Sequence, residues 1–506
     1  MKGAGLRHFE AGWLPAAFLA IAVAVGALLP RSPGAVAGAL AGLCLAITAA
    51  RFAARLPKLF LAFVGTLLAG YAFLGRGFAY LGFRPIYIGE LALGFGLLAA
   101  TASGAIRLGF RSRLVWLLIL FDLWGASRTI PFLWTYGTDA LRDAAIWIYS
   151  IFSILIAASL LSSGWLPRVL KQYGRWLPWF LIWVPTLWWI TRFAYDAVPR
   201  APGGDVPIPS FKPGDAGVHL AGISAFLLVG LYRTRRARAP IRFHPPEWLL
   251  WSAWLFAVML VAALSRGGLL AILVSLVAVL VVRPGSAGRK VIAVAVAAAL
   301  WAAAFVATRP PDTPVLSSPE GDRAISLRQI SANLRSVVTS GRDETLEGSR
   351  RWRLDWWRTI VRYTVFGDQF WTGKGFGVNL ADDDGFQVGD GTLRSPHNSH
   401  MTILAREGVP GAALWVLLQS TFGVALIRAY RRAQRAEQEF LAQVYLWILA
   451  YWLAFLTNMG FDVALEGPQG GIWFWSLFGL GVVALQGEQE AGRGSAAVGL
   501  RDCRAP

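Results

Sequence analysis

The sequence predicts an all-α, polytopic membrane protein, a bundle of about 12 to 14 membrane-spanning helices with a helical cap on its outer side. The chain has 506 residues, of which 56% are hydrophobic and only 15% charged, whereas soluble domains carry roughly 25% charged residues. The apolar residues fall into runs about as long as a membrane crossing requires, and basic clusters separate many of these runs. This pattern excludes a soluble enzyme, a secreted disulfide scaffold and a disordered chain.

Fourteen apolar runs are candidate spans, and the one at 114–127 is short for a full crossing. Their order along the chain is 11–29, 33–50, 59–75, 86–104, 114–127, 144–163, 176–191, 218–232, 247–265, 267–282, 291–307, 409–427, 440–458 and 471–486.

Lys and Arg residues alternate between the two sides of the predicted bundle. With the N-terminus in the cytoplasm, 26 of the 48 Lys and Arg residues fall on cytoplasmic segments. This is the positive-inside signal of membrane proteins, and it accounts for most of the net charge of +19 without a nucleic-acid partner. Both termini are therefore predicted to be cytoplasmic.

One long polar segment interrupts the alternation of spans. It divides the chain into an N-terminal bundle of about eleven spans (1–307), an outer loop or cap (308–407), further spans (408–486) and a cytoplasmic tail (487–506). A structureless loop of this length is unusual in a compact protein. Ser349 can cap a helix that carries Trp352 and Trp356 on one face, so we expect the segment to form a small helical cap.

Three residues near the outer ends of the predicted spans are candidates for chemistry. His397 precedes the return of the chain into the membrane, and histidine is well suited to move a proton near neutral pH. Arg266 lies in an outward turn and Arg192 at the outer end of a span. Two guanidinium groups at this depth are suited to hold the diphosphate of a lipid-linked substrate. The simpler alternatives are an idle loop histidine and arginines that extend to the lipid headgroups.

A metal site is the rival interpretation of the outer loop. It would use Asp382, Asp383 and Asp384 together with His397 and His400, because carboxylates suit Mg²⁺ or Ca²⁺. The glycines between the acidic run and the histidines give no diagnostic ligand spacing. We therefore predict no metal and no cofactor, and interpret the acidic run as a solvated turn.

The residues from about 250 to 425 resemble the bacterial O-antigen ligase/polymerase superfamily. The resemblance rests on His397-Asn398 followed by Gly408-Val-Pro-Gly411, on Ser265-Arg266-Gly267, on Arg350, Trp352 and Trp356, and on Gly373-Lys-Gly375-Phe-Gly377. It implies that His397 is the catalytic histidine, that Arg266 and Arg192 bind the donor diphosphate, and that Asn398, Gly408 and Gly411 support the motif. The sequence departs from the family pattern in one respect. It predicts about fourteen spans, whereas ligases of this family have about twelve.

The resemblance implies an inverting, metal-independent glycosyltransferase of the bacterial inner membrane. The donor would be an undecaprenyl-diphosphate-linked glycan in the periplasmic leaflet, and the acceptor a hydroxyl group of lipid A-core. A diphosphate is already a good leaving group, so the reaction needs charge stabilisation and a base for the acceptor. A polymerase that joins lipid-linked repeats stays open, as does a non-enzymatic transporter of lipid or solute, although no repeated halves are visible.

Overall fold

The computed structural model describes residues 52–83, 86–202, 206–238, 245–308, 329–331, 333, 344–389 and 391–492. Almost all regular structure in them is helical, and the two short strands β1 (Gly82–Phe83) and β2 (Ile86–Tyr87) form one antiparallel pair. The helices of the first half are α3 (Leu56–Leu74), α4 (Ile88–Ala102), α5 (Ile106–Gly109), α6 (Arg113–Thr129), α7 (Leu133–Tyr136), α8 (Thr138–Asp143), α9 (Ala145–Ile148), α10 (Ile151–Ser163), α11 (Leu166–Phe193), α12 (Pro213–Leu228) and α13 (Leu231–Arg238).

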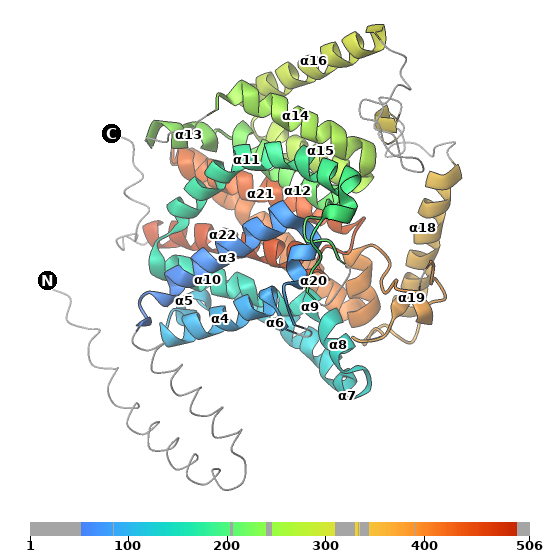
Figure 1. The fold of residues 1–506 in the computed structure, drawn as a ribbon. Coiled ribbons are helices and arrows are strands. Elements are labelled where there is room, and N and C mark those ends of the chain that lie inside the picture. The colour runs from blue at the N-terminus through green and yellow to red at the C-terminus, as the bar shows by residue number, and fades with distance from the viewer. Residues whose placement is uncertain are drawn as a thin grey trace, which may run out of the picture.

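The second half holds the remaining helices of the bundle and those of the cap. They are α14 (Glu247–Leu264), α15 (Arg266–Val282), α16 (Pro284–Thr308), α18 (Glu344–Thr364), α19 (Leu380–Asp383), α20 (Ser399–Arg435), α21 (Glu439–Met459) and α22 (Pro468–Gly492). Three short 3-10 helices are η1 (Gly75–Tyr80), η2 (Ile130–Phe132) and η3 (Tyr195–Ala197). Figure 1 shows the long helices side by side, with α18, α19, α7 and α8 grouped at one end of the bundle.

In the described part of the chain, seven helices are long and apolar enough to cross a membrane, and α4 and α15 are shorter apolar helices. The predicted spans 176–191, 218–232 and 291–307 also fall on helices, namely α11, α12 and α16. The predicted spans 11–29 and 33–50 lie outside the described residues. The predicted fold class, an all-α polytopic membrane protein, is confirmed, whereas the division into 1–307, 308–407, 408–486 and 487–506 stays a prediction.

Glycines allow close packing between α12 and α15. A Cβ atom on Gly217 of α12 would lie 2.6 Å from the Cα atom of Gly268 on α15, and one on Gly268 would lie 3.0 Å from the carbonyl oxygen of Pro213. Without a side chain at these positions the two backbones can approach directly. This contact accounts for Gly268, whereas a Cβ atom on Gly267 would lie 2.8 Å from the Cβ atom of Phe461. The two glycines therefore let the turn that carries Arg266 pack closely on both sides.

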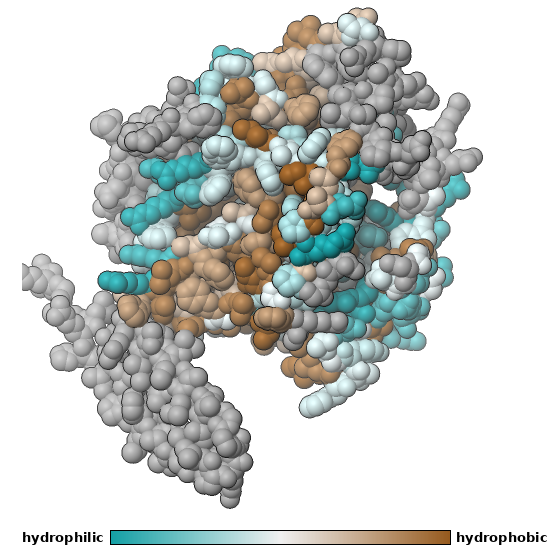
Figure 2. Space-filling model, viewed as in Figure 1, coloured by the Kyte–Doolittle hydropathy of each residue, from teal (hydrophilic) through white to brown (hydrophobic). Residues whose placement is uncertain are grey.

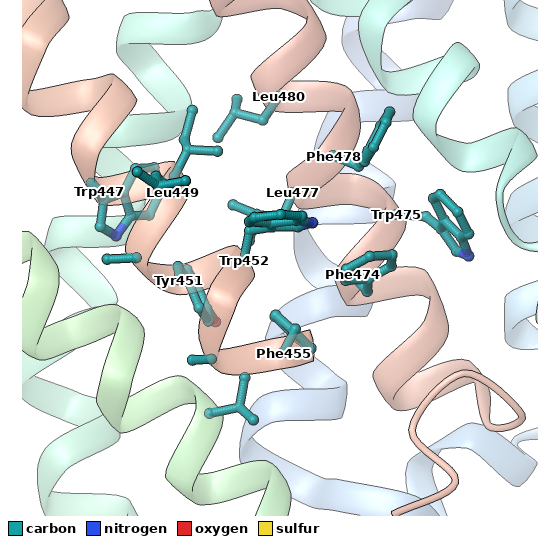
Figure 3. Packing of buried hydrophobic residues seen from close by; sticks show 14 of the residues in the cluster. Trp447, Leu449, Tyr451, Trp452, Phe455, Phe474, Trp475, Leu477, Phe478 and Leu480 are labelled. Carbon is teal, nitrogen blue, oxygen red and sulfur yellow. The ribbon is translucent and has the colours of Figure 1, made fainter. Parts of the chain in front are cut away.

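Aromatic side chains fill the space between α21 and α22 (Figure 3). Trp475 and Phe474 of α22 are fully buried, and Phe474 packs edge-on against Phe455 of α21, with ring centroids 5.9 Å apart. Phe478 stacks on Phe422 of α20 at a centroid distance of 4.0 Å. Such ring pairs add to the stability that burial alone provides, so the last three helices form a rigid support for the segments at their outer ends.

The visible surface agrees with insertion in a membrane. Figure 2 shows apolar residues across the middle of this face and hydrophilic residues towards the ends of the helices. Large apolar side chains such as Leu123, Trp179 and Ile182 are more than half exposed. This exposure is costly in water and favourable in lipid.

The cap has a small core of its own. Trp356 and Ile360 of α18 are fully buried beside Leu380 and Ala381 of α19, and the Trp356 ring stacks on Phe386 at a centroid distance of 5.3 Å. The predicted helical face is therefore present, although the helix begins at Glu344 rather than at the expected cap Ser349. A short segment before α18 also contacts the bundle, because the buried Asn333 donates to the carbonyls of Ala262 and Ala263 at 2.8 Å each.

Candidate active site

His397 lies in the short connection between the cap and α20, at the outer end of the bundle. Its side chain is half-buried, and its backbone is left-handed, with φ of 52°. The preceding Pro396 accepts a hydrogen bond from the Trp357 indole of α18 at 3.1 Å. The following Asn398 caps α20, since its side-chain oxygen accepts from the backbone N–H groups of His400 and Met401 at 3.0 and 3.2 Å. His397 is thus held from both sides by hydrogen bonds of its neighbours.

Gly408 and Gly411 allow α20 to break and then continue. Gly408 has φ of 69°, and a Cβ atom there would lie 2.5 Å from the carbonyl oxygen of Phe370, so glycine is required on two counts. A Cβ atom on Gly411 would lie 2.5 Å from a carboxyl oxygen of Glu407 and 3.0 Å from the Trp124 ring of α6. The motif glycines therefore fix how the helix below His397 approaches its neighbours.

The break at Gly408 removes helical partners from the carbonyl groups just before it, and a glycine-rich run replaces them. The backbone N–H groups of Lys374 and Gly375 donate to the carbonyls of Ala405 and Arg406 at 2.8 and 2.9 Å. The Trp124 indole donates to the carbonyl of Glu407 at 3.0 Å. Gly373, Gly375 and Gly377 all have positive φ angles, so the run can follow the broken helix closely and satisfy groups that would otherwise be buried without partners.

Arg353 acts electrostatically on both His397 and a second arginine, Arg266. Arg353 of α18 donates to the carbonyl of Phe461 at 3.3 Å, in the connection between α21 and α22. Burial lowers the pKa of Arg353, and the positive charge of Arg266 lowers it further, against the carboxylate of Asp462. Arg266 is the first residue of α15, whose cap Ser265 accepts from the N–H of Gly268 at 3.1 Å. Since the two cations repel each other, an anion bound between them would be stabilised.

A lysine with two carboxylates completes the charged surroundings of His397. Lys212, just before α12, contacts Asp462 at 2.6 Å and Asp215 at 3.5 Å. Burial acts to lower the pKa of Lys212, and the two carboxylates outweigh it and raise this pKa to about 12. The lysine is therefore charged at neutral pH, and its neighbours balance that charge.

The pKa of His397 lies below the usual value of 6.5. Burial is the largest cause, the positive charges of Arg353 and Lys212 act in the same direction, and Asp462 opposes them. The imidazole is consequently neutral at neutral pH, which is the form that accepts a proton from a hydroxyl group.

Three of the residues that the rival metal interpretation would use as ligands, namely His400, Asp383 and Asp384, bond to other groups. The two ring nitrogens of His400 bond with the carbonyl of Leu456 at 3.0 Å and the Trp415 indole at 3.1 Å, so this histidine is a structural member of the bundle. Asp383 and Asp384 bind the ammonium group of Lys374, and Asp384 also accepts from the Trp356 indole at 2.6 Å. Within the described ranges, no group of three or more His, Cys, Asp or Glu residues is arranged to hold a metal ion.

Arg192 lies on the last turn of α11. Leu187, five residues before it, lines the same pocket as Lys212. The structure therefore brings Arg192 to the end of the bundle where Lys212 and His397 lie. Its role as a second diphosphate ligand stays a prediction, as do the roles of His397 and Arg266.

Residues 251–416 match the family model described as O-antigen ligase. This match to about a third of the chain supports its resemblance to the O-antigen ligase superfamily. The match covers about the stretch that resembled this family in sequence, and it includes Arg266, Arg353 and His397. The family is one of membrane glycosyltransferases of the ligase or polymerase type. No curated protein matches the chain significantly.

Sequence reasoning missed Arg353, Lys212 and Asp462. A weak signal was available, because charged residues are sparse at the outer ends of spans. Lys212 and Asp462 lie 250 residues apart in sequence, and Asp462 is beyond the stretch that matches the family model. Only the packing of α12 against α21 brings the two together.

Proposed function

We propose that the protein transfers a glycan from undecaprenyl diphosphate to an acceptor hydroxyl group in the periplasmic leaflet of the bacterial inner membrane, with inversion and without a metal ion. The observation that carries the proposal is a neutral histidine near the positive charge of Arg353, which itself lies near a second arginine, Arg266. His397 removes the proton of the acceptor hydroxyl group as that oxygen attacks the anomeric carbon. Arg266 and Arg353, with Arg192 from α11, stabilise the diphosphate as it leaves.

Lipid A-core is the proposed acceptor. A polymerase that accepts a second lipid-linked repeat would use the same donor and the same chemistry, and would differ only in what approaches His397. Purified protein offered isotope-labelled lipid-linked glycan with each acceptor in turn distinguishes the two activities. A transporter would move the glycan without forming a new glycosidic bond, so a complete lack of labelled transfer product with every acceptor would contradict the proposal.

The pH dependence of transfer provides a test of the base. Because the pKa of His397 is depressed, we expect the rate to fall only below the pH at which an ordinary histidine titrates, about 6.5. Arg353→Gln removes a nearby cation, so it should raise the pKa of His397 and move this acid limb to higher pH. Asp462→Asn removes the opposing carboxylate and should move the limb to lower pH. Initial rates at saturating donor measure both shifts, and acid limbs that coincide in all three proteins would exclude His397 as the titrating base.

The orientation of the cap is a second expectation. The side chain of Asp383 is 52% exposed on the cap, and Gln434 is exposed at the opposite end of α20. After replacement of Cys44 and Cys503, an impermeant thiol reagent should label Asp383→Cys in intact spheroplasts and Gln434→Cys only after lysis. The reverse pattern would place the cap in the cytoplasm and the proposed site on the wrong side of the membrane.

A further inference from the structure

The conformation of His397 requires support from its surroundings. Its backbone is left-handed, with φ of 52°, a region that residues other than glycine avoid because the Cβ atom crowds the following carbonyl. Such a conformation persists only when neighbouring contacts determine it. The hydrogen bonds at Pro396 and Asn398 supply two of these contacts, one on each side of the histidine. Stronger contacts lie further out along the chain on both sides.

Asp143, the last residue of α8, anchors the segment that leads to His397. Its side chain is only 6% exposed, and its Oδ2 atom accepts from the guanidinium Nη2 atom of Arg394 at 2.9 Å. The same Nη2 atom donates to the carbonyl of Gly377 at 2.9 Å, and the backbone N–H of Gly377 donates to Asp143 Oδ2 at 3.1 Å. Charge-assisted hydrogen bonds are stronger than neutral ones, so Arg394 is fixed three residues before the histidine.

The same carboxylate oxygen also holds the chain after His397. Arg406, in the first segment of α20, places its Nη2 atom 2.9 Å from Asp143 Oδ2 and is fully buried. Its Nη1 atom donates to the carbonyls of Gly375 and Val378 at 3.2 Å each. Asp143 therefore joins a residue three positions before the histidine to one nine positions after it, and His397 lies on the stretch between these two anchors.

A second carboxylate contributes one further contact. Ser395 donates its hydroxyl hydrogen to the Oε2 atom of Glu466 at 2.7 Å, in the connection between α21 and α22. A single hydrogen bond fixes less than the three that converge on Asp143 Oδ2. The position of the segment is therefore determined mainly by Asp143.

We propose that Asp143 is a positioning residue, which holds His397 through Arg394 and Arg406 at the place from which the imidazole reaches the acceptor hydroxyl group. In this role Asp143 touches neither substrate and acts only through the histidine. The inference rests on the glycosyl transfer proposed above, and it adds which residue sets the geometry of the base.

A positioning role predicts a particular kinetic change. Asp143→Asn keeps the shape of the side chain and removes its charge. We expect kcat to fall about 10- to 100-fold, because a displacement of about 1 Å can cost a positioned group about 10²-fold in rate. The KM values for donor and acceptor should change by less than about 2-fold, since neither substrate contacts Asp143.

The decisive measurement compares Asp143→Asn in two backgrounds. If Asp143 acts only through His397, the substitution should cause no further loss in a protein that already carries His397→Asn. A residue that only stabilises the fold, or that binds a substrate, would lower the rate by the same factor in both backgrounds. Initial rates are compared at equal amounts of folded protein. Losses that multiply in the double variant would overturn the inference.

Arg394→Gln is a second variant, which remains informative if Asp143→Asn folds poorly. It removes the anchor on only one side of His397 and leaves the ion pair of Asp143 with Arg406 intact. The expected result is again a lower kcat with nearly constant KM values, and no further loss in the His397→Asn background.

Glu247→Gln is the matched control. Glu247 also bonds two cations, Arg233 at 2.5 Å and Lys290 at 2.8 Å, so the substitution removes the same kind of shared carboxylate. The residue begins α14, whose other end leads to Arg266, so it lies far from the proposed site. This variant should transfer the glycan at the wild-type rate.

Hydrogen exchange of the full-length protein in detergent tests the anchor without any transfer reaction. Asp143→Asn and Arg394→Gln should speed amide exchange in the segment 394–400 and leave that of α21 unchanged. Unchanged exchange in this segment, or a wild-type kcat in both variants, would overturn the inference. Wild-type transfer by His397→Asn would instead contradict the proposed function, and the exchange rates would still show whether Asp143 holds the segment.

Discussion

Replacing His397 with asparagine is expected to lower the transfer rate by about 10²- to 10⁴-fold, the usual contribution of a positioned base. Asparagine is the preferred substitution because it tolerates the left-handed backbone of this position, φ 52°. It keeps a polar side chain and has no basic nitrogen. His397→Ala should lose as much activity, with a small additional cost in stability from the backbone.

The measurement is the initial rate of glycan transfer by purified protein at equal amounts of folded material. Asp355→Asn is the matched control, because Asp355 lies on the exposed face of the same cap and pairs only with the surface residue Arg358 among the ion pairs described. It should transfer at the wild-type rate. Wild-type activity in His397→Asn would remove the histidine from the mechanism.

Arg266 is expected to give the second largest effect. If its guanidinium group binds the donor diphosphate, Arg266→Lys keeps the charge and loses the planar pair of donors. We expect about a 10-fold loss of kcat/KM for Arg266→Lys and about 10²- to 10³-fold for Arg266→Ala. Arg192 should follow the same order, with smaller losses if it contacts only one of the two phosphates.

An arginine that only reaches for lipid headgroups predicts a different series. Lysine extends to the headgroups equally well, so the Arg266→Lys variant would be fully active. Initial rates against donor concentration separate the two cases. Arg358→Lys, on an exposed residue of α18, is the control and should be silent. Full activity of the lysine variants of both Arg266 and Arg192 would exclude bidentate binding of the diphosphate by these two residues. Other cations, Arg353 first, would then be the candidate ligands.

The bundle could be predicted from the sequence because a membrane span is a local signal. Each predicted span in the described part of the chain falls on a helix, since hydropathy and basic flanks act over about twenty residues. The same local logic located the helix of the cap that carries Trp352 and Trp356. His397, Arg266 and the motif glycines could be identified from the sequence for a similar reason, because each belongs to a short, recognisable segment.

The other half of the site is a product of tertiary packing. Arg353 is one basic residue among several in the cap, and nothing near it in the sequence indicates that it interacts electrostatically with Arg266. The ion pair of Lys212 and Asp462 joins two connections far apart in the chain. The structural role of His400 depends on Leu456 and Trp415, which no spacing rule connects to it.

The contacts that hold the broken helix α20 also bear on how far the protein can be divided or recombined. Trp124 bonds the carbonyl of Glu407, and Asp143 accepts from both Arg394 and Arg406 at 2.9 Å. Trp124 and Asp143 lie well before the stretch that matches the family model. A chimera that exchanged only residues 251–416 with a relative would leave these partners mismatched beneath the histidine. A functional chimera therefore has to exchange α6 and α8 together with residues 251–416, because the contacts that hold α20 are spread over the chain.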